Sequence, residues 1–348
     1  MLTFNHNSHD TTKVVHRAMI TVEIATKPLK IRTKATMVTD VLISEVGPRD
    51  GLQSVKRTMS TADKQRWIDA LVAAGIQEIE VGSFVSPKLL PQMADTAQIV
   101  RHALQYPGLT VMALVPNARG AQMAIDAGVH KVTLPVSASE AHSMANVRKT
   151  RQEMLAEITK IAQLRDQQAP HIKIEAGIST AFGCTIQGEV LEDDVVWLAQ
   201  AAIAAGADES GLSDTTGMAN PAQVKRLFNK VRAAIGEKTG AAHMHNTRGL
   251  GLANCLAAYD AGVRTFDASL AGLGGCPYAP GASGNVVTED LTFMFEAMGL
   301  RTGINLQALI EARKPLAEAL PGEPLYGMTP ASGLPKGFVA ATELGGQP

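Results

Sequence analysis

The stretch Val41-Leu42-Ile43-Ser44-Glu45-Val46-Gly47-Pro48-Arg49-Asp50-Gly51-Leu52-Gln53 joins a short apolar run to a charged exit that is rich in glycine. The apolar part, 41–46, predicts a buried strand, and the glycines and proline after it predict that the strand ends in a turn. Arg49 and Asp50 then lie at the carboxyl end of a strand, where parallel sheets bind ligands. An isolated Arg-Asp pair is more typical of a surface turn, so the rest of the chain must decide.

The same order of strand and then helix continues along the chain. Predicted strands cover 41–46, 77–82, 110–114, 131–135, 172–178, 209–213, 241–245 and 264–270. Several of the helices between them end in an Ala-Gly pair, which is typical of a helix C-cap that leads into the next strand: Ala74-Gly75, Ala127-Gly128, Ala205-Gly206 and Ala261-Gly262. Eight such units predict an α/β fold of the (β/α)₈ TIM-barrel type, because a doubly wound sheet usually has fewer strands.

This pattern divides the chain into three parts. Residues 1–40 are expected to form a poorly ordered extension, 41–300 the TIM-barrel catalytic domain, and 301–348 a C-terminal helix and tail. Helical patterns over 286–298 and 305–320 follow the eighth strand. We expect these extra helices near the barrel mouth.

The composition excludes several classes of partner. Lys plus Arg is 32 against 33 for Asp plus Glu, a net charge of −1, which favours a small-molecule partner over nucleic acid. Three widely spaced cysteines argue for a reducing compartment, and we expect a cytoplasmic protein. No apolar run is long enough to span a membrane, and the N-terminus lacks the pattern of a signal peptide.

Two histidines in the seventh predicted strand are the strongest local signal for chemistry. His243 and His245 are two residues apart, so their side chains point to the same face and can share one metal ion. Buried structural histidines are the alternative. Because the first, seventh and eighth strands are neighbours in a closed barrel, Asp50 can reach the same ion.

The loop after the eighth strand, Gly272-Leu273-Gly274-Gly275-Cys276-Pro277-Tyr278-Ala279-Pro280-Gly281-Ala282-Ser283-Gly284-Asn285, adds two candidates. Its small residues allow the backbone to approach a ligand closely. Cys276 is a candidate acid or base, although a lone cysteine is more often a small core residue. Asn285 can offer its carbonyl oxygen to the ion.

The predicted ligand set is Asp50, His243, His245 and Asn285. Two oxygens and two nitrogens without a thiolate favour Mg²⁺ or Mn²⁺ over Zn²⁺. Glu80, near the end of the second strand, and Asp214, after the sixth, place further acids at the same rim. For Asp214 a role as a helix N-cap is equally consistent with the sequence.

In four segments the chain resembles the family of 3-hydroxy-3-methylglutaryl-CoA (HMG-CoA) lyases, which are metal-dependent TIM barrels with an Arg-Asp at strand one. The segments are Glu45–Gln53, Ser83-Phe84-Val85-Ser86-Pro87-Lys88, the His-x-His strand and the loop Gly272–Asn285. The resemblance covers about 38–320. It implies cleavage of an acyl-CoA thioester to acetyl-CoA and acetoacetate, and a homodimer or higher homo-oligomer.

The resemblance also implies roles for individual residues. It places Arg49 on the substrate carbonyl oxygen and Cys276 in acid/base work, with Glu80 and Asp214 as further catalytic positions. Gln53 and Ser83 match positions that bind substrate.

One segment departs from the family pattern. Where the family is expected to have His-Asp-Thr followed by an aromatic residue, this chain has His245-Asn246-Thr247-Arg248. The change in charge leaves the acyl group open, so a related hydroxyacyl-CoA such as citramalyl-CoA is an alternative substrate. A Claisen-type synthase, a zinc hydrolase and a non-catalytic barrel are the rival interpretations.

Overall fold

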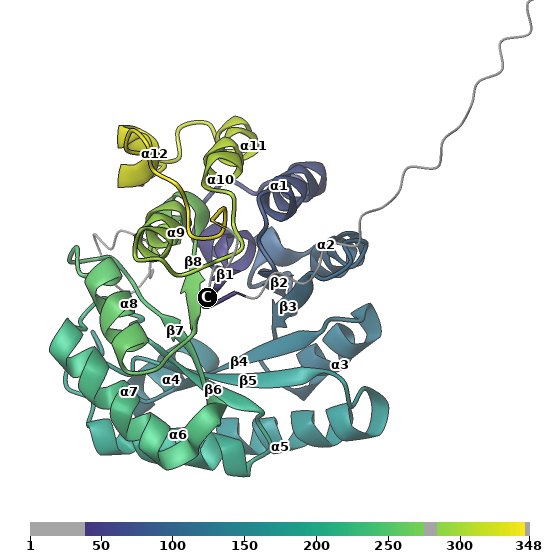
Figure 1. Ribbon diagram of the computed structural model, residues 1–348. Helices are drawn as coiled ribbons and strands as arrows, with labels where there is room; N and C mark the ends of the chain where they lie inside the picture. Colours follow the sequence, from purple (N-terminus) through teal and green to yellow (C-terminus); the bar gives the residue numbers. More distant parts are fainter. Residues whose placement is uncertain (1–38, 275–283, 345–348) are drawn as a thin grey trace, which may run out of the picture. The chain divides into compact units, whose positions relative to one another are not determined.

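Eight parallel strands form a closed barrel in the computed structural model, which describes residues 39–274 and 284–344 (Figure 1). The strands pair in chain order, and β8 closes on β1 with Leu42 opposite Thr265 and Glu45 opposite Ala268. Their bounds are β1 (Leu42–Glu45), β2 (Glu78–Ser83), β3 (Thr110–Leu114), β4 (Lys131–Ser137), β5 (Lys173–Ser179), β6 (Glu209–Ser213), β7 (Thr239–His243) and β8 (Thr265–Ala268). The predicted TIM barrel is confirmed.

Helices follow the strands around the outside of the barrel (Figure 1). Their bounds are α1 (Thr61–Ala73), α2 (Thr96–Ala103), α3 (Ala118–Ala127), α4 (Glu140–Val147), α5 (Arg151–Gln168), α6 (Glu192–Ala204), α7 (Pro221–Ile235), α8 (Gly251–Asp260), α9 (Thr288–Ala297), α10 (Leu306–Glu311), α11 (Arg313–Ala319) and α12 (Met328–Ser332). The cap signals act as predicted: Gly75, Gly128, Gly206 and Gly262 all have positive φ. In the described residues no helix is long and apolar enough to cross a membrane.

The region between β4 and β5 contains two helices. The chain forms α4 first, then Arg148 takes a left-handed conformation with φ 56°, and α5 begins behind a capping box of Thr150 and Glu153. The C-terminal helical pattern over 305–320 is likewise divided into α10 and α11 at Ala312. The start of α5 depends on local capping, which the apolar periodicity does not reveal.

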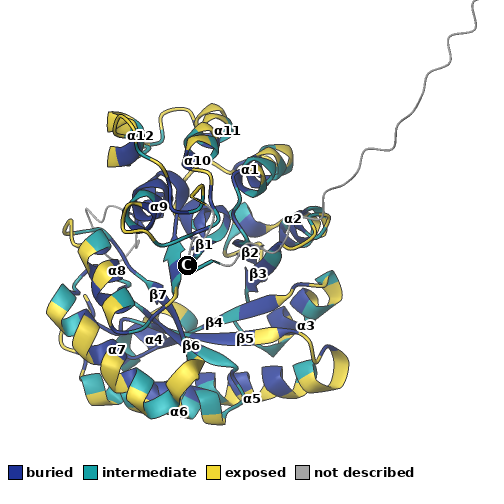
Figure 2. Cartoon of the chain, viewed as in Figure 1, coloured by how far each residue is buried: buried dark blue, intermediate teal, exposed yellow. Residues whose placement is uncertain are grey.

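The hydrophobic core lies between the barrel and its helices, because the outward side chains of the strands are apolar and buried (Figure 2). Ile43 of β1, Leu134 of β4 and Ile178 of β5 are at most 1% exposed. Phe266 of β8 packs against Phe295 of α9 with ring centroids 4.8 Å apart. This shell holds the strands in place, so their inward side chains are free for chemistry.

The amino end of the barrel interior is ionic. Lys131 Nζ lies 2.5 Å from Glu209 Oε1, 2.7 Å from Glu175 Oε2 and 3.9 Å from Glu78 Oε1. We call these four residues the lysine cluster. Burial alone would lower the pKa of Lys131, but the carboxylates outweigh it and raise that pKa well above its usual value. A permanent cation of the protein therefore neutralises part of this acidic layer.

The C-terminal segment returns to the carboxyl end of β8. Helices α10 and α11 pack against α1, and α12 packs against α9. After α11, the Tyr326 N–H donates to the Ala271 carbonyl oxygen at 2.9 Å. Since Ala271 belongs to the short turn η4 (Leu270–Gly272) directly after β8, this segment supports the base of the glycine-rich loop.

Candidate active site

A tight turn after β1 presents Arg49 and Asp50. The turn η1 (Gly47–Gly51) is a single π-helical turn, in which the Val46 carbonyl oxygen accepts the Arg49, Asp50 and Gly51 N–H groups at 3.1, 2.7 and 3.4 Å. Glycine is required at both ends of this turn: a Cβ on Gly47 would lie 2.5 Å from Glu45 Oε1, and one on Gly51 would lie 2.9 Å from Leu273 Cβ. The backbone thus directs two adjacent charged side chains to the same side of the turn, at the carboxyl end of the barrel.

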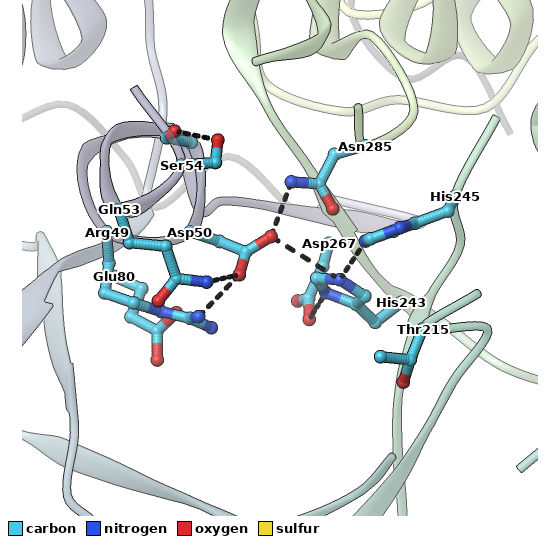
Figure 3. Close-up of polar contacts among 12 residues, drawn as sticks. Arg49, Asp50, Gln53, Ser54, Glu80, Thr215, His243, His245, Asp267 and Asn285 are labelled. Atoms are coloured by element: carbon cyan, nitrogen blue, oxygen red, sulfur yellow. Dashed lines mark hydrogen bonds and ion pairs between the residues drawn. The ribbon is translucent and has the colours of Figure 1, made fainter. Parts of the chain in front are cut away.

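Asp50 lies at the centre of a buried polar group (Figure 3). Its Oδ1 accepts hydrogen bonds from Arg49 Nη1 at 2.6 Å and Gln53 Nε2 at 2.7 Å, and its Oδ2 accepts one from Asn285 Nδ2 at 2.7 Å. His243 Nε2 is 3.9 Å from the same Oδ2. Burial opposes the charge on Asp50, but Arg49 and the two histidines outweigh it and keep its pKa well below its usual range. Asp50 is therefore a carboxylate at neutral pH.

The two histidines converge from β7 and the residues after it. His243 Nε2 and His245 Nε2 are 3.2 Å apart, and both lie close to Asp50. His243 Nδ1 bonds to Asp267 Oδ2 of β8 at 3.0 Å, which leaves Nε2 facing the other ring. Burial and the neighbouring His243 lower the pKa of His245 to about 4. At least one unprotonated ring nitrogen is thus available here.

These groups form what we call the ion cluster: Asp50, His243, His245 and Asn285. The ligand atoms of the first three lie within 4.8 Å of one another. In addition, Asn285 Oδ1 is buried without a hydrogen-bond partner among the described residues. Unsatisfied buried acceptors are costly unless a cation or water satisfies them, so the donor set fits a divalent cation.

Arg49 extends the site towards β2 and β4. Its Nε donates to Glu80 Oε2 at 2.5 Å, and Thr133 Oγ1 of β4 donates to the other oxygen of Glu80. Glu80 is 1% exposed. A guanidinium that is held by two carboxylates has a fixed position, so it can stabilise negative charge that develops next to it without reorganising.

Other predicted residues occupy different places. Asp214 Oδ1 accepts the N–H groups of Met218 and Ala219 at 2.8 and 3.1 Å, so it caps its own loop, while its Oδ2 has no partner among the described residues. Burial raises the pKa of Asp214 to about 6. Ser83 is held by Thr96 through its backbone, and no contact joins its buried hydroxyl to the ion cluster.

Cys276 lies outside the described residues. Arg248, which departs from the expected family pattern, donates through Nη1 to the carbonyl oxygens of Thr216 and Gly217 at 3.2 and 2.6 Å. Its guanidinium therefore braces the loop after β6, and no contact joins it to the described ion cluster.

Three further acids, to which the sequence pattern assigns no role, support the site. Asp267 orients His243, as described above. Glu45 accepts the N–H of Leu270 at 2.9 and 3.1 Å, and Glu289 accepts the N–H of Ala271, whose φ is 59°. The alternation of side chains along β8 could have indicated that Asp267 points into the barrel. Only the register of β7 with β8 places Asp267 beside His243.

The fold and the site together define a class of protein: a TIM barrel with a buried polar cluster at the carboxyl ends of its strands, whose donor set fits a cation. A family model described as HMGL-like matches residues 40–315. The chain belongs to this family, and it is an enzyme of the oxo-acid lyase type.

Named relatives match over most of their own length. The chain is 40% identical to the hydroxymethylglutaryl-CoA lyase of Bacillus subtilis, covering 82% of this chain and 94% of that protein. It is 39% identical to the 3-hydroxy-3-isohexenylglutaryl-CoA/hydroxymethylglutaryl-CoA lyase of Pseudomonas aeruginosa (80% and 93% covered) and 40% identical to the (R)-citramalyl-CoA lyase of Chloroflexus aurantiacus (84% and 95%).

A solved structure agrees with these matches. An HMG-CoA lyase from Acinetobacter baumannii, in complex with coenzyme A and 3-methylmalate, superposes with a TM-score of 0.80 at 39% identity. The match covers 86% of this chain and 97% of that one. This chain therefore shares its fold with that enzyme over nearly the whole length of the solved chain.

Proposed function

We propose that this protein is a divalent-cation-dependent lyase that cleaves 3-hydroxy-3-methylglutaryl-CoA to acetyl-CoA and acetoacetate. The observation that carries the proposal is the adjacency of a fixed guanidinium, Arg49, and an ion cluster at one rim of the barrel. The ion cluster suits the C3 hydroxyl at one end of the bond that breaks, and Arg49 suits the thioester enolate at the other end. The names of the relatives support the substrate.

The reaction needs three things from the protein. The C3 hydroxyl must lose its proton, the C2–C3 bond must break, and the thioester enolate must be held until C2 is protonated. A bound Mg²⁺ or Mn²⁺ would supply Lewis acidity that lowers the pKa of the hydroxyl. Asp50, His243, His245 and Asn285 would hold it, and Gln53 keeps Asp50 oriented by its hydrogen bond.

Arg49 stabilises the enolate in this proposal. Its position is set by Glu80 and Asp50, so its charge is already in place when the thioester oxygen becomes negative. Asp214 is the candidate proton acceptor, since a pKa of about 6 suits general base catalysis near neutral pH. Cys276 is the candidate donor to C2, and Ser83 is a candidate substrate contact; both roles follow from the family resemblance.

A second candidate substrate is citramalyl-CoA, because the relative from Chloroflexus aurantiacus has the same identity to this chain as the lyase from Bacillus subtilis. The two substrates differ in the acid group on C3, whereas the bond that is cleaved has the same chemistry. Direct assay decides between them.

The test is turnover with the purified full chain after removal of bound metal by a chelator. We expect no cleavage without metal, and recovery with Mg²⁺ or Mn²⁺. Acetoacetate from HMG-CoA supports the proposed substrate, whereas pyruvate from citramalyl-CoA, with no acetoacetate from HMG-CoA, would replace it. Equal turnover with and without the ion would contradict the metal-dependent mechanism.

We also propose a cytoplasmic homodimer or larger homo-oligomer that acts in leucine degradation and ketone body formation. The two cysteines in the described residues, Cys184 and Cys255, are both free, which suits a reducing compartment. Light scattering of the purified protein tests the assembly, and cell fractionation tests the location.

A further inference from the structure

Gly177 of β5 is unusual among the glycines of the described chain. Its φ lies outside the left-handed region, and a Cβ built on it would meet no described heavy atom within 4 Å. The other described glycines either have positive φ or lie against a neighbouring group. Neither the backbone conformation nor the packing of the described protein therefore requires glycine at this position.

A bulge does not explain this glycine either. Gly177 pairs in continuous register with Pro135 of β4 and with Gly211 of β6. Its partner Gly211 has an ordinary packing reason, because a Cβ there would lie 2.6 Å from Glu175 Oε1. Glycine inside a strand weakens the strand, and where no bulge or close backbone is present it marks the approach of a ligand.

Gly177 points into the barrel. Strand side chains alternate, and Glu175, two residues earlier, reaches Lys131 in the barrel interior. Its outward neighbours Ala176 and Ile178 are buried beneath the helices. Gly177 itself keeps partial solvent exposure although it lies in the middle of a barrel strand.

The wall around Gly177 is small, neutral and accessible. Four inward residues near Gly177 share its partial exposure: Thr133 and Pro135 on β4, Ser179 on β5 and Ser213 on β6. The outward residues between them are buried. A TIM-barrel interior is usually filled by branched side chains, whereas the small side chains of this wall leave room in front of Gly177.

This wall faces the reacting groups. In a closed barrel of eight strands β5 lies across from β1, which carries Arg49 and Asp50 at its end (Figure 1). Thr133, one inward layer below Gly177 on β4, bonds to Glu80, the partner of Arg49. If the C3 hydroxyl of the substrate faces the ion cluster, the remaining substituent on C3 points away from that cluster, towards this wall.

We propose that Gly177 sets the acyl specificity of the site, and that the enzyme accepts 3-hydroxy-3-alkylglutaryl-CoA thioesters whose C3 substituent is an uncharged alkyl group larger than methyl. The inference rests on the proposed function, because it concerns the same site and reaction. Its chemistry follows from the wall, where glycine, proline and hydroxyl side chains offer space but no charge.

The experiment compares the full-length enzyme with Gly177→Ala and Gly177→Leu, loaded with Mn²⁺. The substrates are thioesters with methyl, propyl or pentyl on C3. We expect cleavage of all three by the parent enzyme. Gly177→Leu should lower kcat/KM for the pentyl substrate relative to the methyl substrate by more than roughly tenfold, the scale of a few methylene groups in a pocket. For Gly177→Ala, the ratio of kcat/KM between the pentyl and methyl substrates should lie between the ratios of the parent and of Gly177→Leu. This variant should also melt at a higher temperature than the parent.

Ile178→Val is the matched control, because it changes the same strand on the outward, buried face. It should leave the ratio between the substrates unchanged. A ratio that Gly177→Leu also leaves unchanged would overturn the inference, as would a parent enzyme that cleaves only the methyl substrate.

A binding measurement separates this inference from the proposed function. Calorimetry of the free 3-hydroxy-3-alkylglutarates with the Mn²⁺-loaded enzyme needs no turnover. Absence of turnover on every thioester would reject the proposed function, while selective loss of pentylglutarate binding in Gly177→Leu would still support the role of Gly177. Equal affinities in parent and variant would reject that role.

Discussion

The two ends of the barrel interior bury ionisable groups in opposite ways. In the lysine cluster at the amino end, Lys131 supplies a cation that is part of the chain and lies within 2.7 Å of two carboxylates. In the ion cluster at the carboxyl end, Asp50 faces two imidazoles and the nearest protein cation, Arg49, is shared with Glu80. A permanent cation neutralises part of the charge at the amino end, whereas the function proposed above assigns an exchangeable ion to the carboxyl end. We therefore expect the lysine cluster to contribute to stability and the ion cluster to contribute to catalysis.

Removing the built-in cation at the amino end should reduce stability more than catalysis. Lys131→Met leaves buried carboxylates without their partner, which costs about 3–5 kcal/mol in free energy of unfolding. Denaturant unfolding measures it. Lys173→Met is the control, since Lys173 pairs with Lys131 in register but its side chain is 67% exposed, and we expect a change within about 0.5 kcal/mol. A stable Lys131→Met with greatly reduced kcat would contradict this division of roles.

Removing the protein cation at the carboxyl end should do the reverse. Arg49→Met is expected to lower kcat by about 10²–10³-fold, the scale of losing one fixed group that stabilises a developing charge. Calorimetric titration should show that the folded variant still binds Mn²⁺. Arg49→Lys tests whether charge alone is sufficient, and we expect it to recover little, because a lysine cannot bridge Glu80 and Asp50 as the guanidinium does. Unchanged kcat in Arg49→Met would remove Arg49 from the mechanism.

A smaller effect is expected from Asp267, which contacts the proposed ligand His243 and not the ion itself. Asp267→Asn removes the carboxylate that accepts from His243 Nδ1, and loss of such a partner typically weakens metal binding by about 10–100-fold. Mn²⁺ affinity, measured by calorimetry or by electron paramagnetic resonance, checks it. Asp260→Asn, on the outside of α8, is the matched control and should bind Mn²⁺ as the parent does. Equal affinity in both variants would show that Asp267 does not position His243.

The pH dependence of ion binding gives the smallest and most specific test. Burial opposes protonation of His243, but the hydrogen bond and charge of Asp267, with the charge of Asp50, outweigh it and raise the pKa of His243 above its usual value. The pKa of His245 is lowered to about 4. Below the raised pKa one proton must leave for each ion bound, so the Mn²⁺ dissociation constant should rise about tenfold for each pH unit lost, down to about pH 5. A hundredfold rise for each unit would mean that both histidines are protonated.

The sequence predicted the parts of this protein that depend on local pattern. Strand β3 and strand β6 have the predicted bounds, and the glycines of the four predicted Ala-Gly helix ends have positive φ. Three predicted ion ligands, Asp50, His243 and His245, lie together because neighbouring strands in a closed barrel end at the same rim. Their role as ligands is still a prediction.

What the sequence did not reveal depends on partners from distant strands. Lys131 and Glu209 stand at the starts of two apolar strands and give no sign of meeting, because only barrel closure and register bring them into contact. Gly177 was equally inconspicuous. A glycine in a strand is informative only once the space in front of it is known.

The hydrogen bond from Asn285 Nδ2 to Asp50 Oδ2 joins residues that are 235 positions apart, across the seam where β8 meets β1. Contacts of such long sequence separation form late in folding, because the closure of a long chain segment has a large entropic cost. A cation held by Asp50 on one side and by His243, His245 and Asn285 on the other would bind only the closed barrel. Added Mn²⁺ should therefore slow unfolding, and a circular permutation that opens the chain between β4 and β5 should retain the ion cluster while moving the seam elsewhere.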